Sequence, residues 1–121
     1  MEIQCLHCHV ASEKNGAEDS IFTATLRLRV DGEVKTEAFC GKGPYQAIFG
    51  AFCRITGMKV SFLPVIEVTE GIAVAMHKSA QAYIRVDLGR KAKHEFASSG
   101  SAVDGLTAFL LALVVLAKKI P

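Results

Sequence analysis

The chain repeats one supersecondary pattern, and this repeat limits its possible folds more than any other feature of the sequence. In each half, strand-like runs are followed by a short glycine-containing segment and then by an apolar helical pattern. The two short segments are Gly41–Ala47 and Ser98–Asp104. A chain of 121 residues is long enough for one domain with a core of its own. The repeat therefore predicts a single domain, residues 1–121, built from two copies of one unit.

The first half predicts three strands. Strands are expected over Ile3–Val10, Ile21–Val30 and Glu33–Cys40, with a polar loop over Ala11–Ser20. The middle strand alternates apolar and polar residues, which is the pattern of a strand with one buried face. Asp31-Gly32 is a strong two-residue hairpin signal, so the second and third strands should pair antiparallel.

A helix is expected to begin at Gly43-Pro44. Proline is favoured near the first helical position, where its missing N–H costs little, and Gly57 can end the helix in a left-handed conformation. The apolar positions that recur at helical spacing are Ala47, Ile48, Ala51, Phe52 and Ile55.

The second half predicts the same order of elements. Pro64 inside the first strand indicates an edge position or a bulge, Gly71 ends that strand, and Asp104 lies in the first turn of the closing helix. The expected fold is α+β: two βββα units that form antiparallel sheet with two helices, unit one at about 3–57 and unit two at about 58–120. The expected elements are strands over Val60–Glu70, Ala73–Leu88 and Lys91–Ala97 and a helix over Ser101–Ile120.

Charge and cysteine content narrow the class of protein. The net charge of +2 comes with scattered lysines and arginines, which gives no indication of a nucleic-acid partner. No apolar stretch follows a basic start, so we expect neither export nor disulfides among the four cysteines. The expected location is the cytoplasm.

The apolar segment Leu106–Ala117 predicts self-association. It is too short for the roughly 20 residues that span a bilayer, so no membrane partner is expected. A helix that is apolar on all sides is normally buried on all sides. One sheet of a small chain cannot cover it completely, so we expect a homodimer.

The segment Cys5-Leu6-His7-Cys8-His9 contains the Cys-x-x-Cys-His string of covalent haem attachment, and its side chains could also bind zinc. Its strand pattern, however, predicts Cys5 and Cys8 on opposite faces. No second cluster of ligands supports a structural zinc site. We therefore expect no cofactor and no metal. Since no catalytic set stands out either, we expect no enzymatic activity.

Taken in order, these features resemble the C-terminal regulatory domain of the 2-isopropylmalate synthase family, which citramalate synthases share. The resemblance extends from Ile3 to the C-terminus. The residues that carry it best are Gly41-x-Gly43-Pro44-x-x-Ala47 and Asp104-x-x-x-Ala108-x-x-x-Ala112-Leu113.

The resemblance implies a non-catalytic domain that dimerises, binds leucine or isoleucine and thereby inhibits a separate metal-dependent barrel. That barrel lies outside this sequence, so a separate catalytic barrel is an expected partner. The chain departs from the family where Tyr45-Gln46 replaces a Val-Asp pair and where Ser98 replaces a glycine. These departures leave open a second hypothesis, that the chain is a dimerisation and assembly module with a degenerate pocket and no ligand.

The candidate ligand contacts lie on the two short segments. Backbone N–H groups of Gly43 and of residues 100–102 are expected to hold the carboxylate of a branched-chain amino acid, while apolar neighbours hold its side chain. The candidate ligand-binding residues are Gly41, Gly43, Pro44, Tyr45, Gly100, Ser101, Ala102 and Asp104.

Overall fold

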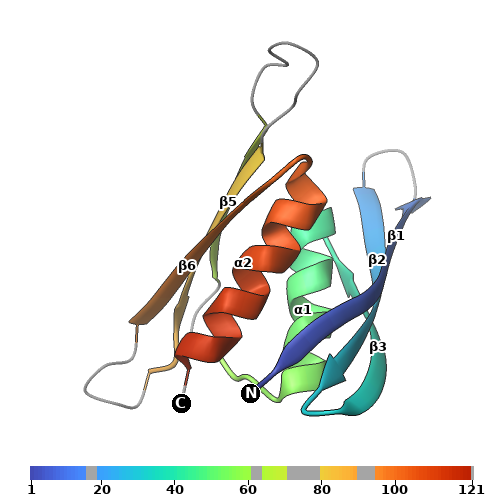
Figure 1. Ribbon diagram of the computed structural model, residues 1–121. Coiled ribbons are helices and arrows are strands. Elements are labelled where there is room, and N and C mark those ends of the chain that lie inside the picture. Colours follow the sequence, from blue (N-terminus) through green and yellow to red (C-terminus); the bar gives the residue numbers. More distant parts are fainter. Residues whose placement is uncertain (16–18, 61–63, 71–79, 90–94, 121) are drawn as a thin grey trace. The chain divides into compact units, whose positions relative to one another are not determined.

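The computed structural model describes residues 1–15, 19–60, 64–70, 80–89 and 95–120. The described residues form two antiparallel three-stranded sheets and two helices in the order βββα–βββα, so the predicted α+β class is confirmed. The chain divides into two compact units, Met1–Met58 and Lys59–Pro121. Figure 1 shows the strands and the helix of each unit.

The sheet of the first unit consists of β1 (Ile3–Asn15), β2 (Asp19–Val30) and β3 (Glu33–Gly41), in that order. Asp31 and Gly32 both have positive φ, 49° and 84°, as the predicted two-residue hairpin requires. The predicted loop over Ala11–Ser20 is wrong at both ends. Lys14 pairs with Ser20 and Asn15 with Asp19, so the two strands stay paired through this polar segment. The segment lacks the alternation of apolar and polar residues by which a strand is recognised in a sequence.

A bulge in β1 changes which side chains share a face. Cys5 pairs with Leu28, whereas His7 already pairs with Arg27, so Leu6 is the extra residue in the ladder. As a result Cys5 and Cys8, which pairs with Leu26, lie on the same face as the buried leucines of β2. The prediction that the two cysteines lie on opposite faces is therefore wrong.

Helix α1 (Pro44–Thr56) packs on β2 and β3. It begins after Gly43 and ends at Gly57 (φ 75°), as predicted. Gly50 lies against the ring of Phe39, where any side chain at position 50 would overlap the ring. The buried apolar side chains of this unit include Leu26, Leu28, Ile48, Phe52 and Ile55.

The second unit contains β4 (Val65–Glu70), β5 (Ala80–Asp87), β6 (Glu95–Ala102) and α2 (Gly105–Lys119). The predicted start of the first strand at Val60 is wrong, since β4 begins at Val65, directly after Pro64. The proline has no N–H to donate to the neighbouring strand, which explains why the strand begins only after it. The prediction for Gly71 and the first part of the predicted strand Ala73–Leu88 lie outside the described residues.

Two predicted boundaries before α2 are also wrong. Strand β6 continues to Ala102 instead of ending at Ala97, and the helix begins at Gly105 instead of Ser101. Small residues in β6 allow the helix to pack directly on the strand. The Ser98 hydroxyl is buried and donates to the carbonyl oxygen of Ala112 (2.6 Å). A Cβ at Gly100 would lie 2.5 Å from the Ala108 carbonyl oxygen.

Helix α2 has one buried face and one exposed face. Ala108, Phe109, Ala112 and Leu113 on the buried face have no exposed surface. The other face carries exposed apolar side chains, as expected for an apolar helix that one sheet of a small chain cannot cover completely. The exposed apolar side chains of α2 are Leu106, Leu111 and Val115. No helix among the described residues is both long and apolar enough to cross a bilayer.

The close approach of α2 to β6 predicts that Gly100→Val destabilises the chain. The added side chain meets helix backbone, which cannot move aside cheaply, so we expect a loss of about 1–3 kcal/mol in the free energy of unfolding. Urea denaturation measures this loss. Ser99→Val, at an exposed neighbouring position of the same strand, is the matched control and should change stability by less than about 0.5 kcal/mol. Equal stability of the two variants would contradict the packing described above.

Candidate functional site

The junction between β3 and α1 is built from backbone with few side chains. Gly41 ends the strand, and a Cβ there would lie 3.0 Å from the backbone nitrogen of Ala47. Gly43 is the extended N-cap residue, no side chain caps this helix, and Pro44 has no N–H to donate. The start of α1 therefore carries the partial positive charge of a helix N-terminus without an acidic residue in its first turn.

Gln46 occupies the space beside this junction. A Cβ at Gly43 would overlap Oε1 of the Gln46 side chain, so that side chain lies over the Gly43 backbone. Gln46 is the third residue of the helix, the position from which Glu or Gln reaches back in a capping box. The resemblance implies a Val-Asp pair at positions 45 and 46. This chain has Tyr45-Gln46 there, so a neutral amide takes the place of a carboxylate at the start of α1.

The start of α2 is different because a carboxylate already occupies it. Oδ1 of Asp104 accepts the backbone N–H of Thr107 (2.8 Å), and Oδ2 accepts its hydroxyl (3.0 Å). The backbone hydrogen bond from Thr107, followed by the one from its hydroxyl, lowers the pKa of Asp104. This junction therefore presents a negative charge where the first presents a partial positive charge.

The structure separates the predicted site residues into three groups. Gly41, Gly43, Pro44 and Tyr45 lie together at the start of α1, and Asp104 caps α2. Residues 100–102 are not in a loop but in β6, where they pair with β5. Gly100 also has a packing role, because α2 approaches it too closely for a side chain. The ligand contact at Gly100 stays a prediction.

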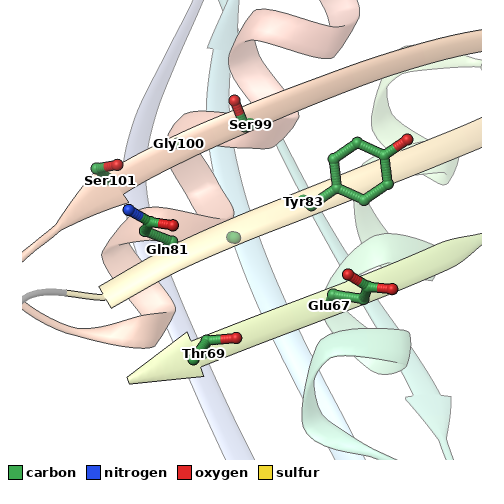
Figure 2. A pocket seen from close by; sticks show the side chains of 8 residues that line it. Glu67, Thr69, Gln81, Tyr83, Ser99, Gly100 and Ser101 are labelled. Carbon is green, nitrogen blue, oxygen red and sulfur yellow. The ribbon is translucent and has the colours of Figure 1, made fainter. Parts of the chain in front are cut away.

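Gly100 and Ser101 line a pocket of about 360 Å³ on sheet β4–β5–β6, on the face opposite α2 (Figure 2). Figure 2 shows polar side chains from all three strands pointing to the same side of the sheet. Pairing places Glu67 beside Tyr83 and Thr69 beside Gln81. Sequence reasoning missed this group, although its signal was present: Gln81 and Tyr83 alternate with the buried Ala80, Ala82 and Ile84. The other lining residues are Ala82 and Ser99.

Burial raises the pKa of three cysteines, Cys5, Cys8 and Cys53, and so keeps them as thiols at neutral pH. Burial, with a smaller contribution from Cys5, raises the pKa of Cys8 to about 11, and burial raises the pKa of Cys53 to about 12. Metal binding and nucleophilic attack both require the thiolate. Within the described part of the chain, no group of three or more His, Cys, Asp or Glu side chains could hold a metal ion.

Comparison with known proteins identifies a family and its relatives. The family model described as the LeuA allosteric (dimerisation) domain matches residues 1–120. A 2-isopropylmalate synthase of Campylobacter jejuni subsp. doylei is 35% identical over 95 residues, which are 78% of this chain and 18% of that protein. A 2-isopropylmalate synthase of Shewanella sp. is 36% identical over 50 residues, 41% of this chain and 10% of that protein. The chain therefore spans less than a fifth of the length of these relatives.

The capping by Asp104 predicts a pH dependence of stability. Folding lowers the pKa of the Asp104 carboxylate below its ordinary value of 3.8. The charged carboxylate therefore stabilises the fold at pH values above 3.8, and this stabilisation is lost as the pH falls through the pKa of the folded state. Asp104→Ala should therefore lower the urea midpoint at neutral pH, and the difference from the parent chain should shrink in strong acid. Asp104→Asn, which keeps a capping oxygen, is the control and should lose less at neutral pH. A difference between parent and Asp104→Ala that does not change with pH would contradict the capping role of the charge.

Proposed function

Because the chain belongs to the family of LeuA allosteric (dimerisation) domains, we propose that it is a non-catalytic regulatory module that binds a branched-chain amino acid, leucine or isoleucine, as a homodimer. The observation that carries this proposal is the family match over residues 1–120. The geometry of the two strand-to-helix junctions supports the class of ligand. We also propose a cytoplasmic location.

The start of α1 suits the carboxylate of an amino acid. Helix N-termini offer unpaired N–H groups and partial positive charge, and this one has no side-chain cap and no acidic residue in its first turn. Neither Gly41 nor Gly43 contributes a side chain of its own to this junction. The proposed contacts at this junction are Gly41, Gly43, Pro44 and Tyr45.

The start of α2 offers the carboxylate of Asp104, the kind of group with which the ammonium group of an amino acid pairs. Its oxygens accept two hydrogen bonds from Thr107, which fix the carboxylate and leave further lone pairs available. Its lowered pKa keeps it charged at neutral pH. The proposed contacts of the second unit are Asp104, Gly100, Ser101 and Ala102.

A second copy of the chain is the proposed cover for the exposed face of α2. Leu106, Leu111 and Val115 are 37%, 47% and 38% exposed, and their burial against another apolar surface would be favourable. In the proposed mechanism, effector binding shifts a dimer between two states by its differential affinity for them. The domain that responds to this shift would be a separate catalytic barrel, as the family resemblance implies.

One observation favours a second candidate function, dimerisation and assembly without a ligand. The Gln46 side chain lies over Gly43, at the place where an effector carboxylate would approach the helix. An effector would have to displace this amide. If it cannot, the chain keeps the family fold as an assembly module only.

Isothermal titration of the purified chain with leucine and with isoleucine tests the regulatory proposal. We expect one of them to bind and Gly43→Val, which displaces Gln46 and covers the helix start, to abolish binding while the variant remains dimeric. A ligand at 100 times its Kd should raise the free energy of unfolding by about 2.7 kcal/mol. Binding that is unchanged in a folded Gly43→Val variant would contradict the placement at α1. No binding by a dimeric parent chain would favour the assembly function.

The dimer proposal makes a separate prediction. Leu111→Lys places a charge on the exposed face of α2 and should shift the chain from dimer to monomer in sedimentation velocity, without loss of helix content. Val34→Lys, at an apolar side chain that is 50% exposed on β3, is the matched control and should leave the dimer intact. A Leu111→Lys chain that stays fully dimeric would rule out this face as the interface.

A further inference from the structure

The pocket on the outer face of sheet β4–β5–β6 lies between two rows of side chains (Figure 2). Each row crosses all three strands, because its members are paired neighbours in the sheet. The first row consists of Glu67, Tyr83 and Ser99, and the second row consists of Thr69, Gln81 and Ser101. We call these side chains together the pocket rim.

The floor of the pocket is backbone. Between the two rows, Ala82 of β5 pairs with Gly100 of β6, and both residues line the pocket. The side chain of Ala82 is buried on the opposite face of the sheet and Gly100 has none, so neither fills the space between the rows. The pocket rim therefore surrounds one hollow of about 360 Å³. This volume lies within the range of about 300–1,000 Å³ that is typical of small-molecule sites.

The pocket rim combines a single negative charge with neutral hydrogen-bond acceptors. Among the described residues that line the pocket, Glu67 is the only one with a charged side chain. The hydroxyl groups and the amide of the other rim residues can all accept hydrogen bonds. Within the described part of the chain, no rim side chain is hydrogen-bonded or ion-paired to another residue, so these acceptors are available. A carboxylate without a neighbouring cation favours a positively charged ligand and disfavours one that carries a phosphate or a carboxylate.

Tyr83 places an aromatic ring beside this carboxylate. It pairs directly with Glu67 and is 38% exposed. The face of a tyrosine ring attracts a cation, because its π-electrons give it partial negative charge. Arg85 is the next outward residue on β5, but it pairs with Val65 in a row outside the pocket, and no ion pair joins it to Glu67 among the described residues. The carboxylate and the ring together are groups that recognise an ammonium ion.

We propose that this pocket binds the ammonium group of a small organic cation that carries no carboxylate. The ammonium group donates hydrogen bonds to Glu67 and contacts the ring of Tyr83, and the second row accepts hydrogen bonds from the other end of the ligand. A free aliphatic amine and a lysine side chain of a partner protein offer the same chemistry. Gly100 and Ser101 are also among the contacts proposed for the amino acid, whereas Glu67 and Tyr83 are not, so variants at these two positions separate the two proposals.

Titration of the uniformly ¹⁵N-labelled full chain with putrescine at constant ionic strength, followed in ¹H–¹⁵N spectra, tests the pocket. We expect saturable shifts of the backbone amides of Ala82, Tyr83 and Gly100. Glu67→Gln keeps the shape of the side chain but removes its charge, so binding should weaken about tenfold. Tyr83→Leu removes the ring and should weaken binding about threefold, whereas Tyr83→Phe keeps the ring and should bind like the parent chain.

Matched controls separate a site from general attraction between charges. Glu95→Gln removes the same charge from the same face of the sheet, outside the pocket, and should bind putrescine like the parent chain. Gly43→Val, which should abolish amino-acid binding, should also leave putrescine binding unchanged. The diol analogue of putrescine lacks the charge and γ-aminobutyrate adds a carboxylate, so each should bind about tenfold more weakly.

A parallel titration with Nα-acetyl-lysine methylamide distinguishes the two sources of the ammonium group. Tighter binding of this compound than of putrescine identifies a lysine side chain, and the reverse order identifies a free amine. Shifts that do not saturate, equal weakening in Glu67→Gln and Glu95→Gln, or equal binding of the amine and its diol analogue would overturn the proposal.

Discussion

Close packing between helix and strand at a glycine is the interaction on which the rest of this structure depends. In the second unit, the absence of a side chain at Gly100 and the hydrogen bond from Ser98 to Ala112 bring α2 against β6. In the first unit, Gly50 brings α1 against the ring of Phe39 on β3. Contacts of this kind fix each helix over its sheet, and they therefore fix the strand-to-helix junction at which the helix begins.

The two junctions have opposite electrostatic character although the repeat makes them topologically equivalent. Gly43 leaves the N-terminus of α1 without a side-chain cap, whereas Asp104 satisfies the N-terminus of α2 and brings a negative charge to it. A free amino acid carries one charge of each sign. The two junctions thus differ in the sign of the charge that each presents to a ligand, and the neutral amide of Gln46 is the feature of this chain that most directly modifies the first of them.

Much of this fold could be predicted from local signals in the sequence. The Asp31-Gly32 turn, the alternation along β2 and the glycine after α1 each depend on interactions between near neighbours, so they can be read from a short window. The failures have a common cause. The bulge at Leu6 and the continuation of β6 through Gly100 are decided by partners that are distant in sequence. For the same reason, the packing of α2 on Gly100 could not be predicted, and the polar group around Tyr83 was missed because three strands assemble it.

The measurement that tests the central claim most directly is a ¹H–¹⁵N spectrum of the uniformly labelled chain during titration with leucine and with isoleucine. The account predicts that one of these ligands shifts the backbone amides of Gly41, Gly43 and Tyr45 in a saturable manner, and that amides in the hairpin at Asp31 and Gly32 do not move. Saturable shifts that leave the start of α1 unaffected, or a spectrum that neither amino acid changes, would contradict it.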